Sequence, residues 1–253
     1  MNSILLALQF FTSLPVQREL PLGKKEVSGM YMALPLIGGG IGLLLGTIAY
    51  IGGDMLGFNS FLVAMLILLV GIVATGGLHV DGFADLGDAF FSYQDREKRL
   101  TIMEDPRLGA FGTISLLVLL GLKVGLFMEI MGMENGWAFL VAVPILSRAT
   151  MVVYFTTTKT AKHNGLAHFF KQHFLKKRMQ AASGLISILT VIGLGVLYDS
   201  LVIVPVMIAT LVIAVYLYRR WTVKHFGGVT GDLCGAFIEG MEVLLWLVLI
   251  AYF

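Results

Sequence analysis

Three aspartates within eight residues are the part of this chain whose types and spacing best suit chemistry. Asp81, Asp85 and Asp88 follow directly on an apolar run long enough to cross a membrane. On a helix, their i, i+4, i+7 spacing places all three on one face, where like charges repel. A divalent cation between them would offset that repulsion, and ligands that are all oxygens favour Mg²⁺. The spacing therefore predicts a magnesium site.

A second segment, residues 102–112, combines a carboxylate and a guanidinium around a proline. Asp105 and Arg107 flank Pro106, and Gly109 stands just before the next apolar run. Guanidinium groups match the geometry of phosphate oxygens, and helix N-termini attract anions, so this segment predicts phosphate binding. The same residues also suit a helix start, with Asp105 as N-cap and proline at the first helical position.

A third segment, residues 225–239, pairs glycines with acidic side chains. Thr230, Gly231 and Asp232 precede the last apolar run, and Glu239 stands seven residues after Asp232, on the same side of a helix. Glycine turns let the backbone approach phosphate, and a carboxylate inside a span is costly unless it is used. These residues are predicted to form part of the same site as Asp81, Asp85 and Asp88.

Two basic residues lie inside apolar runs. Arg148 stands about eight residues, or ~12 Å, from one end of its run and needs a partner, either a carboxylate of the cluster or a bound phosphate. Lys123 shares its run with Glu129, but not at the i+4 spacing of a helical ion pair. It fits a snorkelling side chain or a structural ion pair.

The composition describes an integral membrane protein of one domain, residues 1–253. Of these residues, 57% are hydrophobic and 13% are charged, against about 25% charged in a soluble domain. The net charge of +2 does not indicate nucleic acid, and Cys234 as the sole cysteine excludes a disulfide framework. The N-terminal apolar stretch is too short to span, which favours an interfacial or re-entrant helix.

About seven apolar runs approach the ~20 residues needed to cross hydrocarbon, which predicts an all-α polytopic transmembrane bundle. The runs are 31–51, 60–77, 112–132, 136–156, 181–198, 200–218 and 236–253. Sixteen of the eighteen Lys and Arg residues lie in the N-terminal segment and in the connections after the even-numbered runs. By the positive-inside rule, the N-terminus and the carboxylates face the cytoplasm. Because the fifth and sixth runs nearly touch, a re-entrant hairpin is an alternative there.

Taken together, the motifs closely resemble the cobalamin synthase (adenosylcobinamide-GDP ribazoletransferase) family. The resemblance covers nearly the whole chain, and its most specific parts are GGLHVDGFADLGD at 76–88 and the pattern IMxDxRLGxxG at 102–112. It also rests on FTSLPV at 11–16, PLIG at 35–38, SR at 147–148 and GGxTGDxxGAxxE at 227–239. The chain departs from the family pattern at Pro106, where Ser is usual, and at Ala89, where Gly is frequent.

The resemblance implies a reaction and its substrates. Adenosylcobinamide-GDP and α-ribazole, or its 5′-phosphate, would give adenosylcobalamin, or its 5′-phosphate, and GMP. The ribose hydroxyl would attack the cobinamide-side phosphorus, and GMP would leave. The partners would be these substrates and the lipid bilayer, and the oligomeric state stays open between a monomer and a homo-oligomer.

The resemblance also suggests roles for individual residues. Asp81, Asp85 and Asp88 would hold Mg²⁺ on the pyrophosphate, with Glu239 as a further metal ligand. Asp105 and Asp232 are candidate metal ligands or bases, and His79 is either the base or a hydrogen-bonding anchor. The substrate would be bound by Arg107, Arg148, Gly109, Thr230 and Gly231.

Two other classes of membrane protein share some of these features. A CDP-alcohol phosphotransferase-like lipid enzyme also uses aspartates at a membrane face, but its Asp-Gly-x-x-Ala-Arg element is missing here. In this chain Asp81, Gly82, Phe83 and Ala84 are followed by Asp85. A transporter would have polar residues near the midplane and often internal repeats. Neither a group of polar residues at the midplane nor an internal repeat is clear in this sequence.

Overall fold

Long apolar helices make up most of the structure, a computed structural model that describes residues 2–253. Six of them are long and apolar enough to cross a membrane, or seven if a bent pair counts as one crossing, so the chain is a multi-pass membrane protein. The elements are α1 (Asn2–Phe11), α2 (Lys24–Ala49), the π-helix η1 (Tyr50–Met55), α3 (Ser60–Thr75), α4 (Leu78–Phe91), α5 (Arg96–Ile102), α6 (Ala110–Gly132), α7 (Trp137–Thr157), α8 (Gly165–Gln172), α9 (Lys176–Leu197), α10 (Ile203–Phe226) and α11 (Gly231–Tyr252). The predicted all-helical bundle and short N-terminal helix are confirmed.

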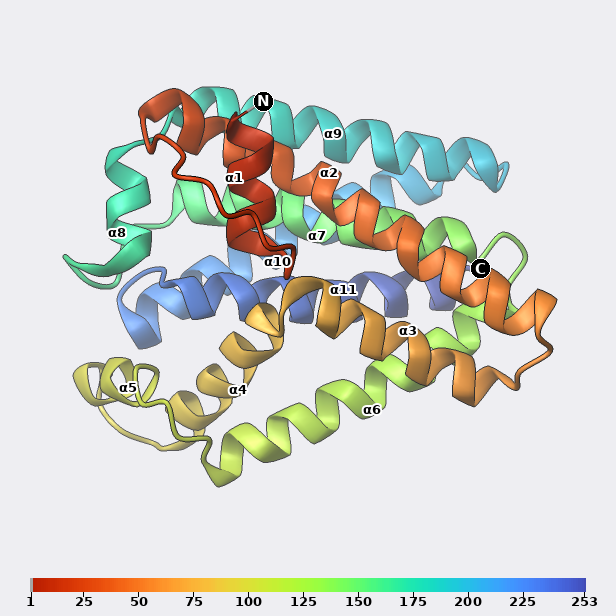
Figure 1. Cartoon of the computed structure of the whole chain (residues 1–253), viewed down its shortest axis with the longest axis horizontal. Coiled ribbons are helices and arrows are strands. Elements are labelled where there is room, and N and C mark those ends of the chain that lie inside the picture. Colours follow the sequence, from red (N-terminus) through yellow and green to blue (C-terminus); the bar gives the residue numbers. More distant parts are fainter. Residues whose placement is uncertain (1) are drawn as a thin grey trace.

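The α7 helix is the centre of the bundle. Most of its apolar stretch is buried within the protein, whereas α9 and α10 expose most of theirs. It packs closely on α2, because Gly38 and Gly42 of α2 lie against the α7 backbone, where a Cβ atom would collide. The long helices run side by side, roughly along the horizontal axis of Figure 1, while α1 crosses them and packs on α2.

The second predicted run differs from the expectation of a straight span. The α3 helix has 16 residues, or about 24 Å, less than the ~30 Å of a hydrocarbon core. Gly76 and Gly77 follow it with φ of +64° and +77°, a left-handed conformation that favours glycine. The next helix, α4, therefore leaves at 92° to α3. The aspartate motif thus lies on a separate helix, outside the six spanning helices.

The bundle has two distinct ends. The short helices α4, α5 and α8 gather at one end, on the left of Figure 1. The connections α2–α3, α6–α7 and α9–α10 lie at the other end, on the right. The α9 and α10 helices have 22 and 24 residues, each long enough for a full crossing, so no re-entrant hairpin is needed at their junction.

Candidate active site

The α4 and α11 helices pack against each other through reciprocal glycines. A Cβ on Gly82 of α4 would collide with the backbone of Asp232, and one on Gly235 of α11 would press on the backbone of His79. This close approach brings the start of α11 beside the aspartates of α4. Asp81 is exposed, and Asp85 and Asp232 are half-buried. Carboxylates from two distant parts of the sequence thus share one site.

The shared site is strongly negative. Burial, and then the charges of Asp81, Asp232 and Asp88, raise the pKa of Asp85 from its usual value to about 7. No lysine or arginine forms an ion pair with Asp81, Asp85 or Asp232 in the part of the chain described. Unpaired carboxylates in such proximity form an all-oxygen donor set of the kind that hard divalent cations prefer.

Asp88, predicted as a third metal ligand, has other partners. Its two carboxylate oxygens accept the backbone N–H groups of Gly109 and Gly112, at 2.7 and 2.8 Å. Both glycines lie at the N-terminus of α6, where N–H groups lack helical partners and favour negative charge. Within residues 2–253, no group of three or more His, Cys, Asp or Glu side chains is arranged to hold a metal ion. Asp88 joins α4 to α6 in this structure, and Gly109 binds it.

Glu239, also predicted as a metal ligand, belongs to a buried charge cluster inside the bundle. Lys123 of α6 donates to both Glu239 and Glu242 of α11, and Arg148 of α7 donates to Glu242. All four side chains are buried. The members of the buried charge cluster are Lys123, Arg148, Glu239 and Glu242. Because two acids balance two bases, the cluster is nearly neutral, as a low-dielectric interior requires.

This cluster also decides the partner of Arg148. Of the two alternatives from the sequence, a carboxylate or a phosphate, the structure provides a carboxylate, Glu242. Ser147 donates to Glu242 as well, at 3.4 Å, and the Lys123 Nζ atom lies 5.5 Å from the ring centroid of Trp246. Arg148 is 3% exposed, so it holds helices together rather than facing the open carboxylate site.

His79 is buried against α11, near the charge cluster. Neither of its ring nitrogens has a hydrogen-bond partner among the described residues, and the side chain is 2% exposed. Burial, and then the positive charge of Arg148, lower the pKa of His79 to about 3. An imidazole with so low a pKa is a weak base near neutral pH. This geometry makes His79 a poor base, and no hydrogen bond among the described residues supports the anchor.

Asp105 and Arg107 form an ion pair with each other on the surface. The Arg107 Nε and Nη2 atoms donate to the two carboxylate oxygens at 2.8 and 2.6 Å. These bonds lower the pKa of the Asp105 carboxyl to about 2, which leaves it a poor base. The Arg107 side chain is 87% exposed and accessible to a phosphate. Asp105 is not the N-cap of α6, since Gly109 occupies that position.

A pocket of about 220 Å³ opens beside Asp232. Its walls come from the end of α5, the α7–α8 connection and the start of α11, and a backbone bridge between Thr160 and Val229 joins the last two. Thr230 caps α11 by accepting the N–H of Leu233 at 3.2 Å. The polar or glycine residues that line the pocket are Glu104, Thr160, Lys162, Asn164, Gly165, His168, Thr230, Gly231 and Asp232. Asp232 itself lines this pocket, which offers a substrate both charge and hydrogen bonds.

Some residues of this region were not predicted from the sequence. Lys162 donates to the carbonyl of Leu100 and pairs with Glu104 at the pocket wall. Arg96 donates to the carbonyls of Phe226 and Ala161 and so fixes α5 to the pocket segments. No spacing signals these contacts, because they join segments 65 and 130 residues apart. A count of intramembrane charges would not have identified the partners of Lys123, because Glu129, Glu239 and Glu242 are all acids within the spans.

Comparison with known proteins places the chain in a family. The model of the family described as Cobalamin-5-phosphate synthase matches residues 3–250. The chain belongs to that family. Curated relatives named adenosylcobinamide-GDP ribazoletransferase include those of Geobacillus kaustophilus (strain HTA426), 37% identical, and Geobacillus thermodenitrificans (strain NG80-2), 38% identical, each covering 97% of this chain and 94% of the relative. The relative from Clostridium tetani (strain Massachusetts / E88) is 34% identical over 98% of the chain and 96% of its own length. No solved structure matches the chain.

Membership of the cobalamin-5-phosphate synthase family confirms the resemblance drawn from the motifs. The carboxylates of α4 and α11 lie within the matched range, as does the pocket beside Asp232. The match extends over nearly the whole chain, so the membrane helices are included with the site. The function to be explained is therefore that of an enzyme of cobalamin biosynthesis.

Proposed function

We propose that this family member is an adenosylcobinamide-GDP ribazoletransferase whose catalytic centre is formed by Asp81, Asp85 and Asp232. The activity follows from the family and from the full-length relatives. The location of the centre is supported by one observation above all. These three carboxylates meet between α4 and α11 beside a polar pocket, and no lysine or arginine among the described residues forms an ion pair with them. The substrates would be adenosylcobinamide-GDP and α-ribazole or its 5′-phosphate.

The donor set of this centre fits Mg²⁺. Asp81 and Asp85 would hold the ion, with Asp232 close to it, and Asp88 and Glu239 are left out because the N-terminus of α6 and Lys123 occupy their oxygens. The bound ion would stabilise negative charge on the phosphate oxygens and on the leaving group.

The chain's own residues position the reactants and accept the proton. Asp232 is the proposed base, since it lines the pocket, while His79 is buried and Asp105 is paired with Arg107. Its carboxylate would accept the proton of the ribose hydroxyl as that oxygen attacks the cobinamide-side phosphorus. The P–O bond to GMP then breaks, and GMP leaves with the electron pair of that bond.

Positive charge for the phosphates would come from Lys162 in the pocket and Arg107 on the surface. Lys162 pairs with Glu104, whose carboxylate is largely exposed, so the ammonium is free to exchange that partner for a phosphate. The backbone at Thr230 and Gly231 would bind phosphate oxygens at the start of α11, where the helix dipole favours an anion. Arg148 is proposed only to hold the helices beneath the centre.

An assay of GMP release tests the function and the centre together. Purified protein with adenosylcobinamide-GDP, α-ribazole and Mg²⁺ should release GMP, and omission of α-ribazole or addition of a chelator should stop it. Asp85→Asn should lower the rate about a hundredfold or more, whereas the control Glu97→Gln, an exposed acid on α5, should keep it. Wild-type turnover by Asp81→Asn, Asp85→Asn and Asp232→Asn would disprove this centre. A CDP-alcohol phosphotransferase would instead release CMP from a CDP-alcohol.

The centre is proposed to face the cytoplasm of a prokaryotic inner membrane. The basic residues gather at the same end of the bundle as the carboxylates, which supports that orientation by the positive-inside rule. The single native cysteine, Cys234, is buried, so engineered cysteines can report the two faces in intact cells. An impermeant maleimide should label Asp199→Cys in the α9–α10 connection but not Lys98→Cys in α5. The reverse pattern would overturn the orientation.

A further inference from the structure

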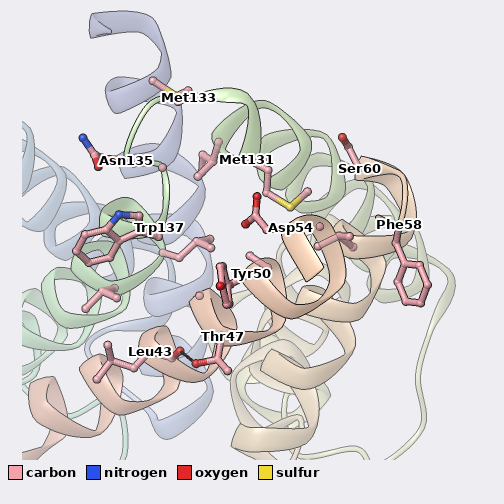
Figure 2. Close-up of a pocket in the computed structure, with 18 residues that line it drawn as sticks. Leu43, Thr47, Tyr50, Asp54, Phe58, Ser60, Met131, Met133, Asn135 and Trp137 are labelled. Atoms are coloured by element: carbon pink, nitrogen blue, oxygen red, sulfur yellow. Dashed lines mark hydrogen bonds between the residues drawn. The ribbon is translucent and has the colours of Figure 1, made fainter. Parts of the chain in front are cut away.

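A large cavity lies at the end of the bundle opposite to the carboxylates. Its volume is about 740 Å³, compared with about 220 Å³ for the pocket beside Asp232, and it falls within the ~300–1,000 Å³ of typical ligand sites. Its walls come from the end of α2, η1, the start of α3, the end of α6 and the start of α7 (Figure 2). None of the residues assigned to the transferase centre lines it, so the cavity needs another explanation.

The lining of this cavity changes from apolar, within the spanning helices, to polar, near the helix ends. Leu43, Leu140 and Val141 supply apolar side chains from within the spanning helices. The polar residues lie nearer the helix ends, where Tyr50 begins η1 and Trp137 begins α7. Tyrosine and tryptophan with one apolar and one polar edge are typical of the headgroup level of a membrane. The cavity therefore suits a molecule with an apolar chain and a polar head.

One unpaired carboxylate determines the charge of the polar part. Figure 2 shows Asp54 between Tyr50 and Met131, with its carboxylate directed into the cavity. No ion pair or side-chain hydrogen bond involves Asp54 in the described part of the chain. Asp54 lies in the π-helix η1, a geometry frequent at functional sites. The three connections at this end, residues 52–59, 132–135 and 199, contain three acids and no Lys or Arg.

We propose that this cavity binds the headgroup and upper acyl chain of a phospholipid that carries a primary ammonium, phosphatidylethanolamine. The ammonium would donate hydrogen bonds to Asp54, a charge-assisted contact. The phosphate would meet neutral donors, the Tyr50 hydroxyl, the Asn135 amide and the Trp137 indole, rather than a cation. An anionic headgroup would bring a second negative charge to Asp54, and a quaternary ammonium has no N–H to donate.

Lipid binding to the purified full-length protein tests this proposal without an activity assay. The protein in detergent is mixed with phosphatidylethanolamine, phosphatidylglycerol or phosphatidylcholine of the same acyl chains. Retained lipid is measured by native mass spectrometry, and the melting temperature is measured in parallel. Wild type should retain phosphatidylethanolamine about tenfold better than either other lipid. Asp54→Asn should lose that preference, and Asp54→Lys should shift it toward phosphatidylglycerol.

A matched control is Asp199→Asn, which removes an acid from the same end of the bundle but not from the cavity wall. It should retain the wild-type preference. Equal retention of the three lipids by wild type, or full preference in Asp54→Asn, would overturn the proposal. Transferase activity in detergent should be the same in Asp54→Asn and wild type, because Asp54 lies at the far end from Asp81, Asp85 and Asp232. The outcome is therefore independent of the proposed function.

Discussion

The α11 helix contributes acidic side chains to two groups, which differ in whether the acids are paired with bases. At its first turn, Asp232 joins Asp81 and Asp85 in a group of acids that have no ion-pair partner within residues 2–253. Two turns further along, Glu239 and Glu242 are buried against Lys123 and Arg148, base for acid. A balanced cluster lowers the cost of charge inside a membrane, while an unbalanced one keeps charge ready for a ligand. Pairing thus distinguishes the structural carboxylates of α11 from the one proposed to act in catalysis.

The largest effect should come from breaking the balanced cluster. Lys123→Met leaves two buried carboxylates with only Arg148, which should destabilise the folded protein by about 3–5 kcal/mol. Thermal unfolding in detergent, followed by tryptophan fluorescence, measures the loss. The matched control is Lys98→Met, since Lys98 is exposed on α5.

The double variant Lys123→Met with Glu239→Gln sharpens the same test. It restores the balance, because Arg148 and Glu242 remain as one pair. Most of the lost stability should return, since a buried charge is costly only when its partner is missing. A double variant that is less stable than Lys123→Met would contradict the idea that charge balance is what the cluster provides.

Substitution in the group of Asp81, Asp85 and Asp232 should affect stability in the opposite way. Asp85→Asn removes one of several mutually repelling acids, so its melting temperature in Mg²⁺-free buffer should equal or exceed that of wild type. In the same preparation, GMP release should be about a hundredfold or more lower. A clear fall in melting temperature would show that Asp85 is a structural residue, and the comparison of the two clusters would fail.

Asp88 differs from both groups, because its partners are two backbone N–H groups and not a base. Its substitution should have a smaller effect. Asp88→Asn keeps one oxygen for the N-terminus of α6 and loses the other along with the charge. We expect a loss of about 1–2 kcal/mol in stability, similar to the loss of a helix cap, with most activity kept. An activity loss as large as that of Asp85→Asn, without loss of stability, would return Asp88 to the metal-binding set.

The smallest effect on stability is expected for the surface pair. Asp105→Asn should leave the melting temperature nearly unchanged, because exposed ion pairs contribute little to stability. If Arg107 binds phosphate, Arg107→Ala should raise KM for adenosylcobinamide-GDP and leave kcat nearly unchanged. A loss in kcat alone would place Arg107 in the transition state instead.

The sequence predicted those features of the fold that depend on local pattern. Apolar length located the helices, and the acid spacing pointed to the candidate site, because both are properties of contiguous segments. The right-angle turn at Gly76 and Gly77 was not predicted, since two glycines in an apolar run are equally compatible with close helix packing. The partners of Arg148 and Asp88 were left open or assigned elsewhere because contacts between helices depend on packing that no spacing within one segment encodes.

The turn at Gly76 and Gly77 has a mechanical consequence for the aspartates. With 14 residues, α4 is an arm of about 20 Å that starts at two glycines, which would be the pivot of any change in its direction. A rotation of about 10° at the pivot would move its far end by about 3–4 Å, more than a metal–oxygen bond length. Asp88 lies near that far end and is held by α6. Its two hydrogen bonds therefore act together with the packing of α4 on α11 to keep Asp81 and Asp85 beside Asp232.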